Sequence, residues 1–500
     1  MQQNPAKYLI LFLLSVSASF SNNSFKAGFS AMKITPEVID TWADVNGDAK
    51  YDPDDGDTYE DNNGNCRFDP IWIAGFHQSR PATGVHDDLW SRVMVIDDGE
   101  IRIAIVALDA IGFFYEDAVD IRESLPKELE IDYTVVCSSH DHEAPDLLGI
   151  WGDGLFTSGV NKDYLQSVKD QTILAITEAV NNLRPSELRF SQDMTGAEHL
   201  VQDTRKPIVL DPGIRIIHVV DTESDTTLGT LISWANHAET LWSDNLLISS
   251  DFPHYIRDGV ENGVRNNGRV VIPGVGGTAV YVNGAIGGLM TTRPNFPIPD
   301  PITNEIHIGA TFEKTRAQGL QIAKLVLNSV HGNAVESITS GKISLVSKPI
   351  FLPVDNWKFR LGFFLGILDR KMSGWMKTAT EVAAFRIGPA DFIAVPGEIY
   401  PEMVNGGIEA PVGQDFNLMP QEIPPLRELM PGKFKFVLGL ANDEIGYIIP
   451  KSEWDTKHPH LYHDHNSPYG EENSMGPETG TIIYRELRNV LEELNGRDSN

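Results

Sequence analysis

Two stretches of sequence decide the fold: Ile101–Asp109, IRIAIVALD, and Tyr133–His142, YTVVCSSHDH. Each contains a continuous run of apolar residues, many of them β-branched, that gives way to polar residues at its end. Apolar runs of this length are typical of strands buried on both faces of a sheet. Each stretch also ends in side chains that can bind a metal or move a proton: Asp109 in the first, His140 and His142 in the second.

Three more runs have the same form and end at, or close before, His237, Glu398 and Tyr447: GTLISWANH (229–237), DFIAVPGE (391–398) and KFKFVLGLAND (433–443). In open α/β sheets, ligands and catalytic groups collect beyond the carboxyl ends of the strands. Five runs in this relation therefore predict one shared site. Two imidazoles and one carboxylate are the ligands of many catalytic zinc centres, so the pattern favours a metal-dependent hydrolase.

The remaining pattern alternates strands with helices. Further strands are predicted at 91–98 and 213–220, and helices at 117–125, 161–183, 306–330 and 481–494. Several strands are too close in sequence for helical crossovers, so the sheet is expected to be mixed rather than parallel. We therefore predict an α/β protein with a mixed β-sheet core flanked by helices, formed as a single large catalytic domain.

Composition narrows the range of partners. The chain has 500 residues, of which 41% are hydrophobic and 22% charged, with a formal net charge of −30. This charge argues against nucleic acid or an anionic membrane as a general partner, and it suits a protein that holds divalent cations. Only Cys66 and Cys137 are present, too few for a disulfide framework.

The N-terminus has the form of a secretory signal. Lys7 precedes the short apolar stretch Tyr8–Leu14, and Val16-Ser17-Ala18 forms a cleavage site. The alternative, a membrane anchor, needs about 20 apolar residues to span. We expect a signal peptide over residues 1–20 and export to the periplasm or the extracellular space.

The segment SSHDHEAPD (138–146) is the sharpest local signal. His140 and His142 are two residues apart and share one face in an extended segment. Near a metal, one imidazole would be a ligand and the other would hold substrate or move a proton. Asp109 is a candidate to accept a hydrogen bond from the second ring nitrogen of a ligand histidine and so to fix its tautomer. In the alternative interpretation, these polar residues only provide hydrogen bonds within a loop.

An acidic segment, DVNGDAKYDPDDGDTYEDNNGNCRFD, spans residues 44–69. Its oxygen-bearing side chains fall at alternate positions between glycines, as in loops that wrap calcium. The candidate ligands are Asp44, Asn46, Asp48, Asp52, Asp61, Asn63, Asn65 and Asp69. Neither half has the glycine of an EF-hand at its sixth position, so we expect an irregular calcium-binding insertion. The alternative is a solvated acidic loop.

The ordered set of motifs resembles the catalytic domain of the neutral ceramidases, zinc amidases that cleave N-acyl sphingosine. SSHDHEAPD is similar to that family's HTHSGP segment, WANHAET to its second histidine segment and VPGE to its PGE segment. LANDEIGYIIP resembles the segment with the metal-bound tyrosine, and GVHDDLWSRVMVI resembles the GIH segment. The resemblance covers residues 27–497, which we take as the ceramidase-like domain.

This resemblance implies roles for individual residues. It makes His140, His237, Glu398 and Tyr447 the zinc ligands, and His142 and Arg205 substrate-positioning groups. The family's second tyrosine falls on Pro459 here. Tyr462 and Tyr469 are close to it, and Tyr462 is our candidate for its role. The implied activity is hydrolysis of an amide or related acyl bond in a small lipid-like substrate. The apolar stretch LGFFLGIL (361–368) would line an acyl pocket or contact a membrane peripherally.

Some features depart from the family. Ceramidases have a serine in a Gly/Asn loop, where this chain has VNGAIGGLMTT with Gly287 and Gly288. The chain also ends where the resemblance to the catalytic domain ends, without the family's C-terminal β-sandwich. We therefore expect a substrate other than ceramide. The alternative function is a calcium-stabilised exported binding protein that retains the fold without catalysis.

Overall fold

A computed structural model describes residues 24–288, 290–463 and 468–498. The predicted signal peptide, 1–20, lies outside the described residues. Within these three ranges, no helix combines the length and the apolar character needed to cross a bilayer.

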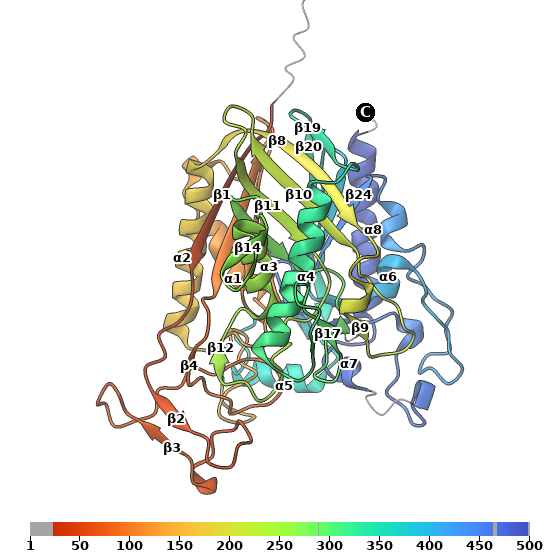
Figure 1. Cartoon of the computed structure of the whole chain (residues 1–500). Helices are drawn as coiled ribbons and strands as arrows, with labels where there is room; N and C mark the ends of the chain where they lie inside the picture. The colour runs from red at the N-terminus through yellow and green to blue at the C-terminus, as the bar shows by residue number, and fades with distance from the viewer. Residues whose placement is uncertain (1–23, 289, 464–467, 499–500) are drawn as a thin grey trace, which may run out of the picture.

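The largest element is a nine-stranded mixed sheet with the order β15-β11-β10-β8-β1-β5-β6-β7 and β19 paired to β8 (Figure 1). Both antiparallel and parallel pairs occur in it, so the predicted mixed α/β class is confirmed. Its strands are β1 (Lys26–Lys33), β5 (Trp90–Asp97), β6 (Arg102–Leu108), β7 (Tyr133–Ser138), β8 (Arg184–Asp193), β10 (Ile214–Asp221), β11 (Thr227–Ser233), β15 (Thr278–Val282) and β19 (Glu336–Ile338).

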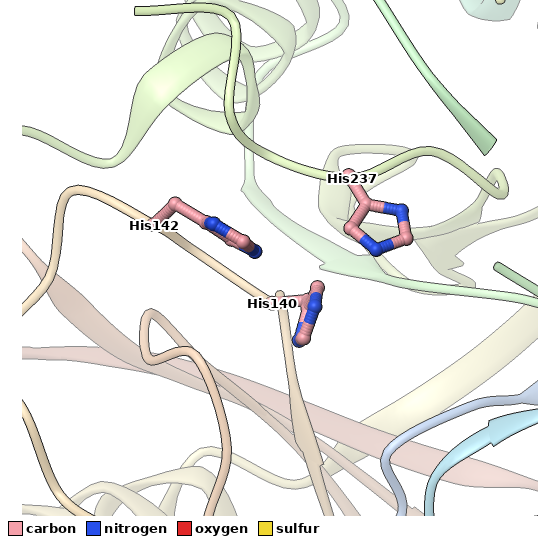
Figure 2. A group of neighbouring side chains, drawn as sticks. All are labelled: His140, His142 and His237. Atoms are coloured by element: carbon pink, nitrogen blue, oxygen red, sulfur yellow. The ribbon is translucent and has the colours of Figure 1, made fainter. Parts of the chain in front are cut away.

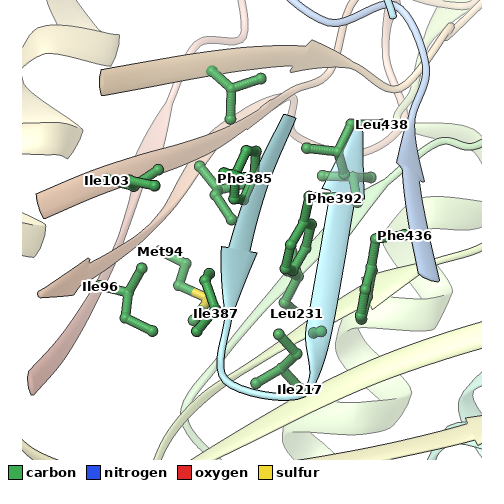
Figure 3. Close-up of a cluster of buried hydrophobic side chains, with 14 of the residues drawn as sticks. Met94, Ile96, Ile103, Ile217, Leu231, Phe385, Ile387, Phe392, Phe436 and Leu438 are labelled. Carbon is green, nitrogen blue, oxygen red and sulfur yellow. The ribbon is translucent and has the colours of Figure 1, made fainter. Parts of the chain in front are cut away.

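A second, four-stranded sheet packs on the inner face of the first. It comprises β20 (Ile343–Pro353), β21 (Lys377–Ile387), β22 (Ala390–Ala394) and β24 (Phe434–Leu438). Figure 3 shows the core between the two sheets, where Phe385 and Phe392 of the small sheet lie among Met94, Ile103 and Ile217 of the large one. The Phe385 and Phe392 rings stack with centroids 4.5 Å apart. Apolar side chains cover both faces of these strands, because the other face of the small sheet also packs in an apolar cluster, which includes α8.

Helices cover the outer faces of both sheets. The helices α1 (Tyr115–Ser124), α2 (Lys162–Asn181), α3 (Asp251–Asn262) and α4 (Phe312–Val330) pack on the large sheet, and α8 (Thr479–Asp498) packs on the small one. Asn161 caps α2 by accepting backbone N–H groups of Asp163 and Tyr164. The helix predicted from Ile306 begins later, because Thr311 is the N-cap and residues 306–307 form strand β18.

Short strands and helices complete the described chain. The strands are β2 (Thr41–Ala43), β3 (Thr58–Glu60), β4 (Gly84–Val85), β9 (Gln202–Asp203), β12 (Leu247–Ile248), β13 (Val264–Asn266), β14 (Arg269–Ile272), β16 (Met290–Thr291), β17 (Ile298–Pro299), β18 (Ile306–His307), β23 (Glu398–Ile399) and β25 (Tyr447–Ile448). The helices are α5 (Trp357–Leu365), α6 (Pro401–Asn405) and α7 (Tyr469–Glu472).

Three parallel strand pairs bring the predicted site residues together. The pairs are β6–β7, β11–β15 and β22–β24, and each leaves its carboxyl end at the same edge of its sheet. Backbone bonds join these ends across the two sheets: Ser138 N–H donates to the Leu440 carbonyl at 3.1 Å. The Asn283 side-chain amide donates to the carbonyls of Ser139 and Asn236, both at 2.9 Å. The strand ends therefore form one framework rather than three separate loops.

Candidate metal centre and its cavity

Three histidine side chains converge beyond the carboxyl ends of β7 and β11 (Figure 2). His140, His142 and His237 each offer a ring nitrogen, and these nitrogens all lie within 4.8 Å of one another. The His140 ring centroid is 4.8 Å from that of His142 and 4.7 Å from that of His237. A bridge between Asp141 and Ala238 holds the two loops side by side, with His142 N–H donating to the Ala238 carbonyl at 2.9 Å.

Glu398 and Tyr447 reach the same place through a short parallel pairing. The strands β23 and β25 put Glu398 directly opposite Tyr447, and the Tyr447 hydroxyl donates a hydrogen bond to the Glu398 carboxylate. Glu398 Oε2 lies 3.0 Å from His237 Nε2 and 3.7 Å from His140 Nε2. The other three residues predicted as zinc ligands are thus grouped around the Glu398 carboxylate.

Backbone carbonyls fix the histidine rings. His140 Nδ1 lies 2.7 Å from the carbonyl oxygen of Ile111, and His237 Nδ1 lies 2.7 Å from that of Met290. If Nδ1 carries the proton and donates to these carbonyls, Nε2 presents its lone pair toward Glu398, as in a metal ligand. The prediction that Asp109 fixes a tautomer is wrong, because its carboxylate accepts hydrogen bonds from Arg257 at 2.7 and 2.9 Å.

Burial and neighbouring charges shift the pKa values of the three histidines. Burial lowers the pKa of His140 to about 4, and burial together with the neighbouring imidazoles lowers the pKa of His142 well below its ordinary value. Burial would also lower the pKa of His237, but its hydrogen bond with Glu398 and the charges of Glu239 and Glu398 raise it to about 9. His140 and His142 are therefore neutral at pH 7, whereas His237 holds a proton beside Glu398. A metal ion bound at His237 would have to displace that proton, because a ligand imidazole must be neutral.

The donor set fits a metal ion. Among the described residues, neither ring nitrogen of His142 has a hydrogen-bond partner, although both atoms are buried. Buried Glu398 Oε2 faces the ring nitrogens of His237 and His140, at 3.0 and 3.7 Å. Buried polar atoms without partners are rare in folded proteins and point to an unseen ion or water. A divalent cation among the imidazoles would satisfy these lone pairs. Two donor sets are available: the predicted four residues, or the three histidines as a group.

The metal centre opens into a cavity of about 240 Å³. Its polar wall contains His140, His142, Glu398 and Tyr447. The other walls are mainly apolar, and their larger side chains are Phe76, Ile111, Phe114, Leu148, Ile150, Trp151, Phe359, Phe363, Leu368, Ile445 and Met475. A few convergent polar groups at one side of an apolar pocket are typical of sites for small, largely apolar ligands.

Two polar residues of this cavity were not among the predicted site residues, although Tyr469 lies close in sequence to the position of the family's second tyrosine. Glu444 lines the wall with Oε2 unpaired, and burial followed by the charge of Glu398 raises its pKa well above the ordinary value. Tyr469, at the start of α7, shares a hydrogen bond with Tyr447. Glu444 lies three residues before Tyr447 in LANDEIGY, which was the only available sign of its position.

The other two predicted catalytic residues lie outside the cavity lining. Arg205 is partly buried, with its guanidinium 3.1 Å from Glu402 and 3.2 Å from Glu453 and stacked over the Tyr400 ring. Its charge is therefore met by carboxylates of the chain itself, and these contacts give no support to a substrate-positioning role. Tyr462 donates its hydroxyl proton to Glu409 in a hydrogen bond and does not line the cavity.

The acidic insertion projects from the body beside the β2–β3 pair (Figure 1). It contains the same turn twice, seventeen residues apart. Asp44 accepts the N–H groups of Gly47 and Ala49, and Asp61 likewise accepts those of Gly64 and Cys66. The remaining candidate ligands bond mainly within the same turns: Asn46, Asp48, Asp52, Asn63, Asn65 and Asp69. The calcium assignment stays a prediction.

The fold of this chain is similar to that of solved ceramidase structures. The chain is similar to neutral ceramidase from Pseudomonas aeruginosa, with a TM-score of 0.63 and 16% sequence identity over 95% of this chain and 75% of that one. A ceramidase described as complexed with C2 is similar at a TM-score of 0.63 and 16% identity, over 95% of this chain and 76% of that one. No protein-family model and no curated protein matches the sequence. The fold is ceramidase-like, which confirms the predicted resemblance for the fold.

Proposed function

We propose that the protein is a zinc-dependent hydrolase of an amide or related acyl bond, with His140, His237, Glu398 and Tyr447 as metal ligands. The observation that carries the proposal is the approach of two histidine Nε2 atoms to one buried carboxylate oxygen, at 3.0 and 3.7 Å. The ceramidase-like fold supports the same chemistry. A divalent zinc ion supplies, when bound, Lewis acidity toward a carbonyl and a water of pKa about 7.

The chain's own residues complete the site. The ring nitrogens of His142 have no hydrogen-bond partner among the described residues, and Nδ1 lies 3.5 Å from Glu239 Oε2. The ring lines the cavity wall, where it can hold or polarise the substrate carbonyl. Tyr447 and Tyr469 place hydroxyl groups beside Glu398, available to stabilise negative charge on the carbonyl oxygen. The apolar walls hold the acyl group and exclude water from the polar side, which strengthens every electrostatic contact there.

The proposed substrate is a small lipid-like acyl amide that differs from ceramide. The apolar lining of the cavity supports an acyl chain as one part of the substrate. Gly287 occupies the loop that contains serine in the ceramidases, so the contacts made from that side differ.

A hydrolysis screen tests this function. Purified protein would be assayed against N-acyl amines, N-acyl amino acids, ceramide and simple esters, with and without chelator. We expect turnover that is lost with chelator and restored by zinc, and slower turnover of ceramide than of the best other amide. Chelator-resistant turnover would contradict the metal mechanism, and ceramide as the best substrate would contradict the substrate assignment.

We also propose that the protein is exported and that the acidic insertion binds calcium. The charged, apolar and small-residue order of residues 1–20 supports export. The test is fractionation of cells that express the full chain, with N-terminal sequencing of the mature protein. Recovery of uncleaved protein in the cytoplasm would contradict export.

A further inference from the structure

Helix α5 exposes apolar side chains that the rest of the chain does not cover. None of its residues is buried, although its sequence is WKFRLGFFL. Phe364 is 86% exposed, and Leu155 and Phe156 of a neighbouring loop are 75% and 72% exposed. We call the following set the apolar rim: Leu155, Phe156, Trp357, Leu361, Phe364 and Leu365. Contiguous exposed apolar residues on a soluble fold mark a surface that contacts something else.

The apolar rim is continuous with the metal centre. Leu155, Phe156, Trp357 and Leu361 line a second cavity of about 420 Å³. This outer cavity and the metal-site cavity share four lining residues, namely Ile150, Phe359, Leu368 and Asn473. Helix α5 thus presents Phe359 to both cavities and Phe364 to solvent. An apolar molecule at the rim could therefore move along apolar side chains through the outer cavity into the metal-site cavity.

Charge around the rim differs from that of the whole chain. The chain has a net charge of −30, yet residues 357–377 contain five basic residues and one acidic residue. Lys358 pairs with Glu472 at 2.9 Å, and Arg360 pairs with Asp355 at 3.1 Å. Within the part of the chain that the structure describes, the ammonium groups of Lys371 and Lys377 have no carboxylate partner. Cations beside aromatic side chains match the phosphates of a lipid surface.

We propose that the apolar rim docks on a zwitterionic phospholipid surface, so that a lipid-like substrate passes from the lipid into the outer cavity. The entry of substrate rests on the proposed function, whereas the docking does not. The net charge disfavours a strongly anionic surface.

Docking is tested by sedimentation of the full protein with phosphatidylcholine vesicles. We expect the wild type to sediment with the vesicles and Phe364→Ser/Leu365→Ser to bind at least about tenfold more weakly. Ile306→Ser/Ile308→Ser is the matched control, because both isoleucines are more than half exposed and line neither cavity. Its binding should equal that of the wild type.

Activity measurements separate docking from catalysis. Phe364→Ser/Leu365→Ser should keep its turnover of a water-soluble short-chain amide and lose turnover of a long-chain amide presented in vesicles. Absence of all hydrolysis with retained vesicle binding would contradict the proposed function alone. Wild type that stays in the supernatant would overturn the docking proposal. A dimer in solution that Phe364→Ser/Leu365→Ser dissociates would also overturn it, because the rim would then be a protein interface.

Discussion

Gly287 packs against the backbone of Glu398 so closely that a β-carbon at position 287 would lie 2.7 Å from the Glu398 carbonyl oxygen. The same atom would lie 2.3 Å from the Tyr400 ring and 2.6 Å from the Ile399 carbonyl carbon. The Gly287 N–H already donates to the Ile399 carbonyl at 2.9 Å. A glycine at position 287 is therefore needed for the present position of the Glu398 segment.

We predict that Gly287→Ser displaces Glu398 and lowers both stability and metal content. Overpacking of this kind costs about 1–3 kcal/mol. Gly288→Ala is the control, because its β-carbon would have no neighbour closer than 3.4 Å, while its φ of +72° costs about 1–2 kcal/mol by itself. The two variants should unfold at similar denaturant concentrations, but only Gly288→Ala should retain stoichiometric metal. Equal metal content in both would contradict the prediction.

A second prediction concerns the histidines. His237→Ala should remove the metal, with affinity reduced more than the 10–100-fold that loss of a supporting contact causes. His218→Ala is a matched control: His218 is also buried, but its Nδ1 lies 3.2 Å from the Thr230 hydroxyl and its ring is outside the cavity. Metal analysis after chelation and reloading with zinc measures the difference. Full zinc content in His237→Ala would show that His237 is not a ligand.

The predicted proximity of the candidate ligand side chains follows from strand direction. His140, His237 and Glu398 each follow an apolar run, and parallel pairing brings the ends of such runs together. Glu398 and Tyr447 are also in register in a strand pair of only two residues each, which is too short to give a sequence pattern. Their shared location was predicted from the apolar runs that precede them, and the family resemblance added their roles as ligands.

The role of a polar side chain could not be predicted from the sequence where it depends on which other side chain it binds. Asp109 and Arg205 both looked available for the site, but each binds an oppositely charged side chain of the chain itself. Glu444 looked like an ordinary loop acid and instead lines the cavity with an unpaired oxygen. Such pairings join residues far apart in sequence, so no local pattern contains them.

We predict that calcium stabilises the acidic insertion. Binding to the native state alone would add about 2.7 kcal/mol at a calcium concentration 100 times the Kd. Asp61→Asn should weaken this effect, because Asp61 holds the second turn by accepting three backbone N–H groups. Asp225→Asn is the control, since that side chain is 89% exposed in a separate turn. Identical melting temperatures and loop proteolysis with EDTA and with calcium would rule out the site.

The last prediction concerns Asp203, whose carboxylate is buried and accepts the backbone N–H groups of Arg205 and Val209, both at 2.9 Å. Burial, followed by the charge of Glu402, raises the pKa of Asp203 to about 7. In the unfolded chain an aspartate has a pKa of about 3.9. Between these values the folded state holds a proton that the unfolded state has lost, so stability falls as pH rises from about 4 to about 7.

Replacing Asp203 with asparagine should remove this contribution, which is on the order of 2–4 kcal/mol. The Asp203→Asn variant is expected to lose stability at pH 4, where it forfeits one backbone hydrogen bond, and to recover relative to the wild type at pH 7. Asp221→Asn should behave oppositely, because backbone N–H groups of Glu223 and Ser224 lower the pKa of Asp221 and favour its charged form. Urea unfolding at both pH values measures the two differences, and parallel pH profiles for wild type and Asp203→Asn would contradict the assignment.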